Sequence, residues 1–415
     1  MKKYLKKNFY ITTVFLTISL FVRVLSINYF GDDKIDMEWG ILLHNLNNFG
    51  VLGINVFDGF EVVHRKAIMG QLVLPSVYMP PFYTFFLYCI NLAVETNELF
   101  VLVVLYIQLF ISLLSLYFFY LLLSKFYSKK ITLIGCSLLS VFPINVYAVS
   151  QISSVVFQVF FVVLFLYFFF ELLEKKNIKS LIKFSFTSSM LILLRGEFFL
   201  FYLLTLIFIF IQKIEFKLII LSLLIVILTI SPYLTRNYKT FNEITLTKSA
   251  GFNLWKGNNK YSGVEGGEEI YNEDMLQKIK AIKLDNKYEI NLDNLYKNEA
   301  INNIVSDPKK YLDLYVKKFF TFIFFNTKSI YPNYNNLFHI LPKIFISITT
   351  LIGIFMIGFK KNDLHFFSLY YLFNISFFSL FFILPRYGLT LLPVQIVLSC
   401  YILKKLNLKI KDNND

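Results

Sequence analysis

Long apolar segments alternate with short polar connections along most of the chain. The first covers residues 9–29, and ten more follow, at about 82–93, 99–123, 131–149, 152–173, 180–194, 198–211, 216–234, 340–359, 364–384 and 389–403. About 20 apolar residues span a bilayer as a helix, so the short run after Pro81 is the least comfortable span. The pattern predicts an all-α polytopic membrane protein with about ten or eleven transmembrane helices.

Two longer polar stretches interrupt this pattern and divide the chain into three parts. Residues 1–235 form an N-terminal transmembrane module whose first outer loop is 30–81. Residues 236–339 form an outer-face loop domain, and 340–415 contain the last transmembrane helices and a cytoplasmic tail. In the first loop, Met37, Ile41, Leu42 and Leu46 have the spacing of an amphipathic helix on the membrane surface. Residues 296–320 predict two helices separated by an Asp-Pro break.

The lysines indicate which connections face the cytoplasm. They gather at 125–130, 175–183, 213–217, 360–361 and 404–411, between apolar runs. The positive-inside rule puts these clusters in the cytoplasm and puts 150–151, 195–197, 236–339 and 385–386 on the outer face. The net charge of +14 is therefore a topology signal. Because no basic stripe is interleaved with a polar surface, a nucleic-acid partner is not expected.

Composition supports a membrane protein and offers no metal motif. Hydrophobic residues make up 56% of the chain. The three cysteines lie far apart in apolar segments, and the four histidines have no paired spacing. We expect no required cofactor, and no ligand set here demands a divalent metal.

Four carboxylates follow the first apolar segment directly: Asp32, Asp33, Asp36 and Glu38. On a helical spacing, Asp32 and Asp33 share a face with Asp36. Carboxylates beside a membrane are often functional, and partial burial or like-charge neighbours raise the pKa of a general base. Asp36, with Asp33 beside it, is our candidate base. The alternative is a solvated loop with a helix cap.

Arginine is rare in this lysine-rich chain. Only Arg23, Arg65, Arg195, Arg236 and Arg386 occur, and three of them lie at outer helix ends in the assigned topology. The planar guanidinium matches phosphate oxygens, which makes Arg195, Arg236 and Arg386 candidates for a phosphate site. The alternative is that each snorkels to the interface.

Arg195-Gly196-Glu197 places opposite charges at the end of an apolar helix. The two side chains form either a local ion pair that eases a helix junction or a polar floor for an active cavity. The sequence leaves both interpretations open.

Several short motifs resemble glycosyltransferase family 39 and its bacterial relatives. That family belongs to the GT-C class and includes protein O-mannosyltransferases and the lipid A aminoarabinose transferase. The matching positions are Arg236-Asn237-Tyr238, Phe241, the string from Gly251 to Asn259, the loop residues Asp36, Trp39, Leu42, Leu46 and Gly50, the pair Pro80-Pro81, and Pro385-Arg386-Tyr387-Gly388-Leu389 with Pro393. The family often has Asp-Glu in its first loop. This chain instead has Asp32-Asp33 and, further on, Asp36 and Glu38.

The resemblance implies a GT-C-type inverting glycosyltransferase in the cell membrane, with its active site on the outer face. The sugar donor would be a polyprenyl-phosphate lipid and the acceptor a lipid, a glycan or a protein. Asp36 would act as base with Asp33, while Arg236 and Arg386 would hold the donor phosphate with help from Arg195. The substrate loop would comprise Glu38, Glu197, Asn237, Asn253, Trp255 and Asn258.

Three alternatives remain open from the sequence. They are a transporter or lipid flippase, a glycan polymerase or ligase of another membrane class, and a structural membrane subunit. Few charges inside the apolar helices and no visible inverted repeat argue against transport.

Overall fold

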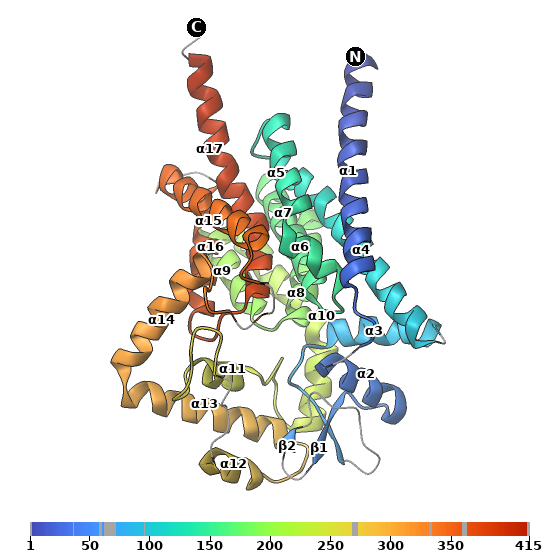
Figure 1. Ribbon diagram of the computed structural model, residues 1–415, viewed down its shortest axis with the longest axis vertical. Coiled ribbons are helices and arrows are strands. Elements are labelled where there is room, and N and C mark those ends of the chain that lie inside the picture. The colour runs from blue at the N-terminus through green and yellow to red at the C-terminus, as the bar shows by residue number, and fades with distance from the viewer. Residues whose placement is uncertain are drawn as a thin grey trace.

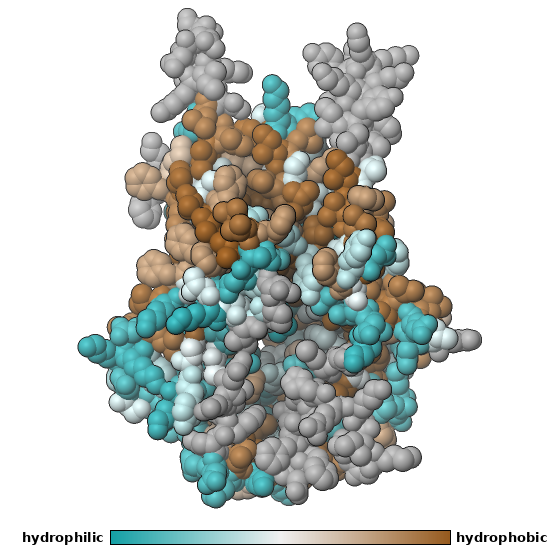
Figure 2. All heavy atoms as spheres, in the orientation of Figure 1, coloured by the Kyte–Doolittle hydropathy of each residue, from teal (hydrophilic) through white to brown (hydrophobic). Residues whose placement is uncertain are grey.

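The computed structural model describes residues 2–35, 37–57, 60–61, 72–94, 96–267, 273–329, 331, 334–358 and 363–412. Helices dominate these residues, and both chain ends lie at one end of the molecule in Figure 1. Polar segments gather at the opposite end, below the apolar helices. Figure 2 shows the same division, with hydrophobic side chains above and hydrophilic ones below.

Most helices of the upper region match the apolar runs of the sequence. They are α1 (Lys2–Phe30), α3 (Pro81–Ala93), α4 (Asn97–Ser124), α5 (Lys129–Val141), α6 (Pro143–Tyr147), α7 (Val155–Lys175), α8 (Ile178–Leu194), α9 (Phe198–Ile211), α10 (Phe216–Phe241), α15 (Leu337–Ile357), α16 (His365–Phe378) and α17 (Leu392–Asp412). Two 3-10 turns, η1 (Ala148–Ser150) and η2 (Pro385–Leu391), precede α7 and α17.

Five helices among the described residues are long and apolar enough to cross a membrane. They are α4, α7, α10, α15 and the continuous η2–α17 segment. A sixth span forms if the pair 129–141 and 143–150, bent by 58°, is counted as one. Pro143 lacks the N–H that would continue the helix, which explains the bend. The chain is thus a multi-pass membrane protein, and the count of ten or eleven spans stays a prediction.

Contacts between helices define the two ends of the bundle. Lys125 pairs with Glu174 at 2.5 Å, and the Nζ of Lys404 donates to the carbonyl of Phe126 at 3.1 Å. These contacts bring the ends of α4 and α7 together with the middle of α17. At the other end, the amide of Asp32 donates to the carbonyl of Ser150 at 2.9 Å. The assignment of these ends to the two sides of the membrane stays a prediction.

The lower region contains the remaining elements. These are α2 (Met37–Phe49), β1 (Gly53–Phe57), β2 (Phe60–Glu61), β3 (Leu72–Pro75), α11 (Ala250–Gly257), α12 (Glu273–Lys280), α13 (Tyr288–Ser306) and α14 (Pro308–Ile323). Asp307 caps α14 by accepting from the Lys310 amide at 3.1 Å, so the expected Asp-Pro break is confirmed.

The first loop departs from the all-α prediction. Its strands form an antiparallel sheet in the order β2-β1-β3, with Ile54 opposite Leu74. Residues 53–56 alternate apolar and small or polar positions, which is a strand pattern too short to stand out beside the long apolar runs. The expected amphipathic helix is present as α2. Its apolar side packs on β1 and α3, with Leu42 and Leu43 buried. This side therefore faces protein, whereas the sequence pattern predicted that it would face the membrane surface.

Arg23 lies inside the bundle, fully buried on α1. Its Nε donates to Ser112 Oγ of α4 at 2.9 Å, and its Nη1 donates to the Ser140 carbonyl of α5 at 3.0 Å. These bonds join three apolar helices through one side chain, which is a structural use of an intramembrane charge. Arg65 lies outside the described residues.

Candidate functional site

Two of the three candidate phosphate-binding arginines meet at one aromatic ring. The Cζ of Arg195 lies 5.0 Å from the centroid of the Tyr387 ring, and that of Arg386 lies 5.9 Å from it. Arg195 also lies over the Phe378 ring, at 5.6 Å. Arg195 is half-buried and Arg386 is exposed, so both guanidiniums can be reached from outside. We refer to Arg195, Arg386 and Tyr387 as the arginine cluster.

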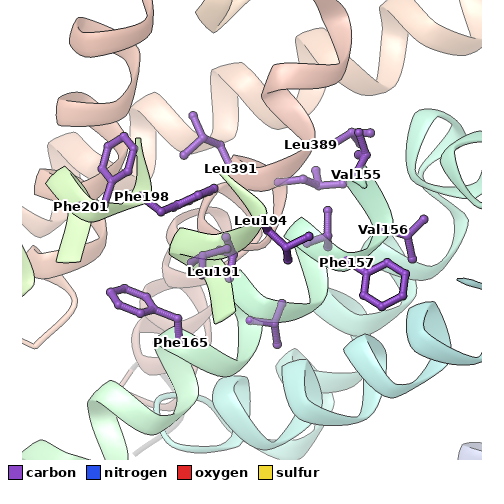
Figure 3. Close-up of a cluster of buried hydrophobic side chains, with 14 of the residues drawn as sticks. Val155, Val156, Phe157, Phe165, Leu191, Leu194, Phe198, Phe201, Leu389 and Leu391 are labelled. Carbon is purple, nitrogen blue, oxygen red and sulfur yellow. The ribbon is translucent and has the colours of Figure 1, made fainter. Parts of the chain in front are cut away.

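A dry apolar core fixes the segments that carry the arginine cluster. Figure 3 shows Leu191 and Leu194 of α8 with Val155 and Phe157 of α7 and with Leu389 of η2. Leu194 directly precedes Arg195, and Leu389 follows Tyr387 by two residues, so packing at these positions sets where the polar side chains start. Arg195 is oriented further by Gln158 of α7, whose Oε1 accepts from Nη1 at 3.4 Å.

Carboxylates face both arginines. Glu197 forms an ion pair with Arg195, so the local ion pair expected from the sequence is present. Glu38, in the first turn of α2, acts electrostatically on Arg386, together with Tyr331 and Tyr387. The start of the first-loop helix therefore lies within electrostatic range of η2, although about 350 residues separate them.

Asp32 is held at the same end of the bundle. Its Oδ2 accepts from the Ile152 amide at 2.6 Å, just before α7 begins. The sequence suggested that Asp32 and Asp33 share a helical face with Asp36, and this is wrong. Helix α1 ends at Phe30 and residues 31–35 are not helical, which leaves Asp33 exposed in a connecting loop. The helix ends before Gly31, where a side chain would not fit: a Cβ there would lie 2.3 Å from the Ile27 carbonyl oxygen. Asp36 lies outside the described residues.

Arg236 does not join the arginine cluster through any contact of the described residues. It lies near the end of α10, where Nη1 donates to the Ser76 carbonyl at 2.8 Å and Nη2 donates to the Leu52 carbonyl at 3.0 Å. Nη1 also donates to the side chain of Asn237 at 2.9 Å, and Asn237 in turn donates to the Thr245 carbonyl. These bonds clamp the first-loop sheet onto α10.

Glu289 of α13 completes this clamp from the other side. Its two oxygens accept from Ser76 Oγ at 2.8 Å and from the Val77 amide at 2.6 Å. Burial raises the pKa of Glu289 to about 7, against the lowering effect of these hydrogen bonds and of Arg236. The strand end at Ser76 is thus held by an arginine and a buried carboxyl group.

In the string from Gly251 to Asn259, residues 251–257 lie in α11 and the two asparagines follow it, and the helix is packed tightly on its neighbours. A Cβ at Gly251 would lie 2.0 Å from the Asp293 carbonyl oxygen, and one at Gly257 would lie 2.5 Å from the Phe381 carbonyl carbon. Only glycine permits these approaches of backbone to backbone. The spacing of the two glycines therefore reflects how α11 docks on α13 and on the segment before η2.

Three candidate substrate residues lie on or beside α11. Asn258 donates to the carbonyls of Leu254 and Leu380, both at 2.8 Å, and accepts from the fully buried Lys318 at 3.3 Å. Trp255 is buried against Tyr296, with 4.9 Å between ring centroids, while Asn253 is half-buried. The contacts of Asn258 and Trp255 stabilise the outer region, and a role in binding substrate stays a prediction.

In the part of the chain that the structure describes, no group of three or more histidine, cysteine, aspartate or glutamate side chains comes together in a way that could hold a metal ion. The first-loop acid Asp36 lies outside this part of the chain.

The fold itself has known counterparts. The chain resembles the oligosaccharyltransferase of Archaeoglobus fulgidus. The similarity holds for a structure tethered to an acceptor peptide with an NVT sequon (TM-score 0.55, 12% identity, 96% of this chain and 50% of that chain). It also holds for the complex with Zn and sulfate (TM-score 0.51, 12% identity, 95% and 49%) and for the apo form (TM-score 0.50, 12% identity, 97% and 52%).

The chain therefore shares its fold with an archaeal oligosaccharyltransferase, and it spans about half the length of that protein. No family model matches the sequence. No curated protein matches it either.

Sequence reasoning did not assign a role to Tyr387, Gln158 or Glu289. Tyr387 follows Arg386 in the Pro-Arg-Tyr-Gly-Leu string, and an aromatic residue next to an arginine is a sequence feature that could have indicated a cation–π contact. Gln158 and Glu289 are single polar residues whose partners lie far away in the sequence, so no local pattern indicates them.

Proposed function

We propose that this protein is a membrane glycosyltransferase that moves a sugar from a polyprenyl-phosphate-linked donor to a lipid, glycan or protein acceptor on the outer face of a cell membrane. The observation that carries the proposal is the arginine cluster, where Arg195 and Arg386 converge on Tyr387 at the end of the bundle that also holds Asp32. Two accessible guanidiniums at a membrane face suit the phosphate of a lipid-linked donor.

The proposed reaction needs a base and a cationic site for the leaving group. A nucleophilic oxygen or nitrogen of the acceptor attacks the anomeric carbon, and the bond from that carbon to the phosphate oxygen breaks with inversion. The proton of the acceptor passes to a first-loop carboxylate, for which we retain Asp36, assisted by Asp33. The lipid phosphate leaves with the bonding electron pair, and Arg386 and Arg195 stabilise the negative charge that develops on its oxygens.

The remaining candidate residues have different roles in this proposal. Glu197 and Gln158 orient Arg195, and Glu38 balances the charge of Arg386. Arg236, Asn237, Trp255 and Asn258 hold the outer region in shape, and Asn253 is the half-buried position of α11 through which a substrate could be contacted.

A polypeptide is the first acceptor to test, because the archaeal oligosaccharyltransferase of similar fold is tethered to an acceptor peptide. Lipid and glycan acceptors follow. The remaining alternatives are a lipid flippase and a glycan polymerase or ligase of another membrane class.

The test is a transfer assay with purified full-length protein. Radiolabelled sugars linked to polyprenyl monophosphate and to polyprenyl diphosphate are offered with peptide, lipid and glycan acceptors, and Asp36→Asn and Asp33→Asn are assayed in parallel. We expect transfer by the wild type and its loss in Asp36→Asn, with a smaller reduction in Asp33→Asn. If the wild type transfers no sugar but moves the labelled lipid across a vesicle membrane, the flippase alternative is correct. Full activity of Asp36→Asn would exclude it as the base.

A further inference from the structure

A narrow cavity lies beside the arginine cluster and contains a lysine that the proposed reaction does not use. It is bounded by the end of α14, the start of α15, η2 and the loop at Glu265. The residues that line it include the polar side chains of Glu265, Asn326, Tyr334 and Lys343, together with Pro385 and Gly388 of η2. Pro385 and Gly388 flank Arg386 and Tyr387 in the sequence, so the cavity and the arginine cluster share η2.

Lys343 brings a positive charge to this cavity. Among the described residues, the structure gives its ammonium no ion pair and no hydrogen bond. A Cβ built on Gly388 would lie 3.7 Å from the Lys343 Nζ, which places the ammonium directly against the bare backbone of η2. A half-buried ammonium without a counter-charge in an apolar helix is unfavourable, and an ionisable group at such a place in a membrane protein points to a ligand.

Among the described residues, the lining contains one carboxylate, that of Glu265. Its Oε1 accepts from the Asn326 Nδ2 at 2.9 Å. Within this part of the chain, no ion pair joins Glu265 and Lys343. The charge of Lys343 is therefore available to an anion that enters beside Gly388.

The outer face of the same helix is suited to a lipid chain. Leu341, Phe345, Ile348, Ile352 and Phe355 are all exposed and recur at three- and four-residue intervals along α15. They form an apolar stripe suited to the hydrocarbon of a membrane, while Lys343 lines the cavity. A ligand that combines an apolar chain with an anionic head group matches both faces of this helix.

Two tyrosines are shared between the cavity and the arginine cluster: Tyr334 lines the cavity, and Tyr331 acts electrostatically on Arg386 and Tyr387. Lys343 Nζ lies 3.7 Å from the Cβ position of Gly388, which follows Arg386 by two residues. An anion held by Lys343 would therefore lie against the same 3-10 turn that carries Arg386.

We propose that the Lys343 cavity is a binding subsite for the phosphate of an isoprenoid phosphate lipid, held by Lys343 on the cavity side and by Arg386 on the cluster side. This inference rests on the proposed function and specifies how the lipid phosphate is held. The phosphate lies in the cavity, and the isoprenoid chain follows the apolar stripe of α15 into the membrane.

The experiment measures binding by purified full-length protein in detergent. The probes are a polyprenyl monophosphate, the corresponding polyprenol and inorganic phosphate, and the proteins are the wild type, Lys343→Met, Lys343→Arg and Lys317→Met. Lys317 is an exposed neighbour on α14 and serves as the matched control. A hydrogen bond to a charged group contributes about 1.5–3 kcal/mol, so Lys343→Met should bind polyprenyl monophosphate about 10- to 100-fold more weakly. Lys343→Arg and Lys317→Met should bind it like the wild type, and no variant should change polyprenol binding.

Thermal unfolding without ligand separates this role from a structural one. Removing a half-buried charge that has no counter-charge should leave the Tm of Lys343→Met unchanged or raise it. A lower Tm would identify Lys343 as a structural residue and overturn the proposal, as would wild-type affinity of Lys343→Met for polyprenyl monophosphate. If inorganic phosphate bound as tightly as the lipid, the site would serve a soluble anion and the lipid assignment would be wrong.

Failure of this inference is distinguishable from failure of the proposed function. Sugar transfer by the wild type with unchanged lipid binding in Lys343→Met refutes the subsite alone. Absence of transfer with weakened lipid binding in Lys343→Met refutes the glycosyltransferase assignment and leaves the subsite intact.

Discussion

The guanidinium of Arg195 lies over the ring of Tyr387, with 5.0 Å between its Cζ and the ring centroid, and Arg386 approaches the same ring at 5.9 Å. One aromatic side chain thus positions two cations that come from η2 and from the end of α8. The face of the ring attracts both guanidiniums and offsets part of the repulsion between two like charges.

Tyr387→Leu should reduce sugar transfer about tenfold or more, because each guanidinium loses a cation–π contact of about 0.5–2 kcal/mol and with it a defined position. Tyr387→Phe keeps the ring and should retain most of the activity. The measurement is kcat/KM for the lipid-linked donor. Equal activity of the leucine and phenylalanine variants would show that the ring does not position the arginines.

Arg236→Met should destabilise the protein by about 2–4 kcal/mol, because the buried carbonyls of Leu52 and Ser76 lose their donors. Thermal unfolding in detergent measures the effect, and Lys239→Met, an exposed change near the end of the same helix, should leave the Tm unaltered. Should Arg236→Met instead keep its Tm and lose donor binding, Arg236 would be a phosphate ligand, as first expected from the sequence.

Glu289 should make stability depend on pH. Its pKa is about 7 in the folded protein, against an ordinary value of 4.5, because the carboxyl group is buried. Between these values the folded state keeps a proton that the unfolded chain has lost. The free energy of unfolding should therefore fall by about 3 kcal/mol as the pH rises from 4.5 through 7. The stabilisation that Glu289 contributes is fully present only below pH 4.5.

Glu289→Gln isolates this contribution. An amide cannot titrate, so the variant should lose less stability than the wild type between pH 5 and pH 8. It should also be less stable than the wild type at pH 5, because the amide has one acceptor oxygen for the two donors Ser76 Oγ and Val77 N. Parallel Tm curves for the two proteins would refute the assigned pKa.

Gly251→Ala should prevent α11 from docking, since the new methyl group would lie 2.0 Å from the Asp293 carbonyl oxygen. We expect a loss of about 3 kcal/mol or more, or failure to fold. Gly263→Ala is the matched control, because the nearest atom to its Cβ, the Gly266 carbonyl oxygen, lies 3.7 Å away. If both variants had the wild-type Tm, the glycine in the Gly251–Asn259 string would not be explained by packing.

The helices could be predicted well from the sequence, since each long apolar run has a physical requirement to be helical in a membrane. The run at 131–149 was predicted as one segment and is bent at Pro143. The first-loop sheet was missed because its strands, such as β1 with residues 53–57, are too short to show a reliable alternation.

The site could be predicted only in part. Arg195 and Arg386 were selected because arginine is rare here, and they do converge. Arg236 was selected on the same grounds, yet its neighbours are carbonyl groups of the first loop, which no local pattern shows. Asp32 and Asp33 were placed on a helical face because their spacing allowed it, whereas Gly31 ends the helix before them. Pairings such as Glu289 with Ser76 depend on tertiary packing and carry no signal in the sequence.

The most direct test of the account measures kcat/KM for sugar transfer from a polyprenyl-phosphate-linked donor by the wild type and by Arg386→Gln, with the Tm of both proteins recorded. Arg386 is exposed, so the variant should fold normally. The account predicts a loss of about 10²–10³-fold in kcat/KM with an unchanged Tm, because a cation that stabilises the leaving phosphate is removed. Wild-type kcat/KM in Arg386→Gln would contradict the assignment of the arginine cluster as the donor phosphate site.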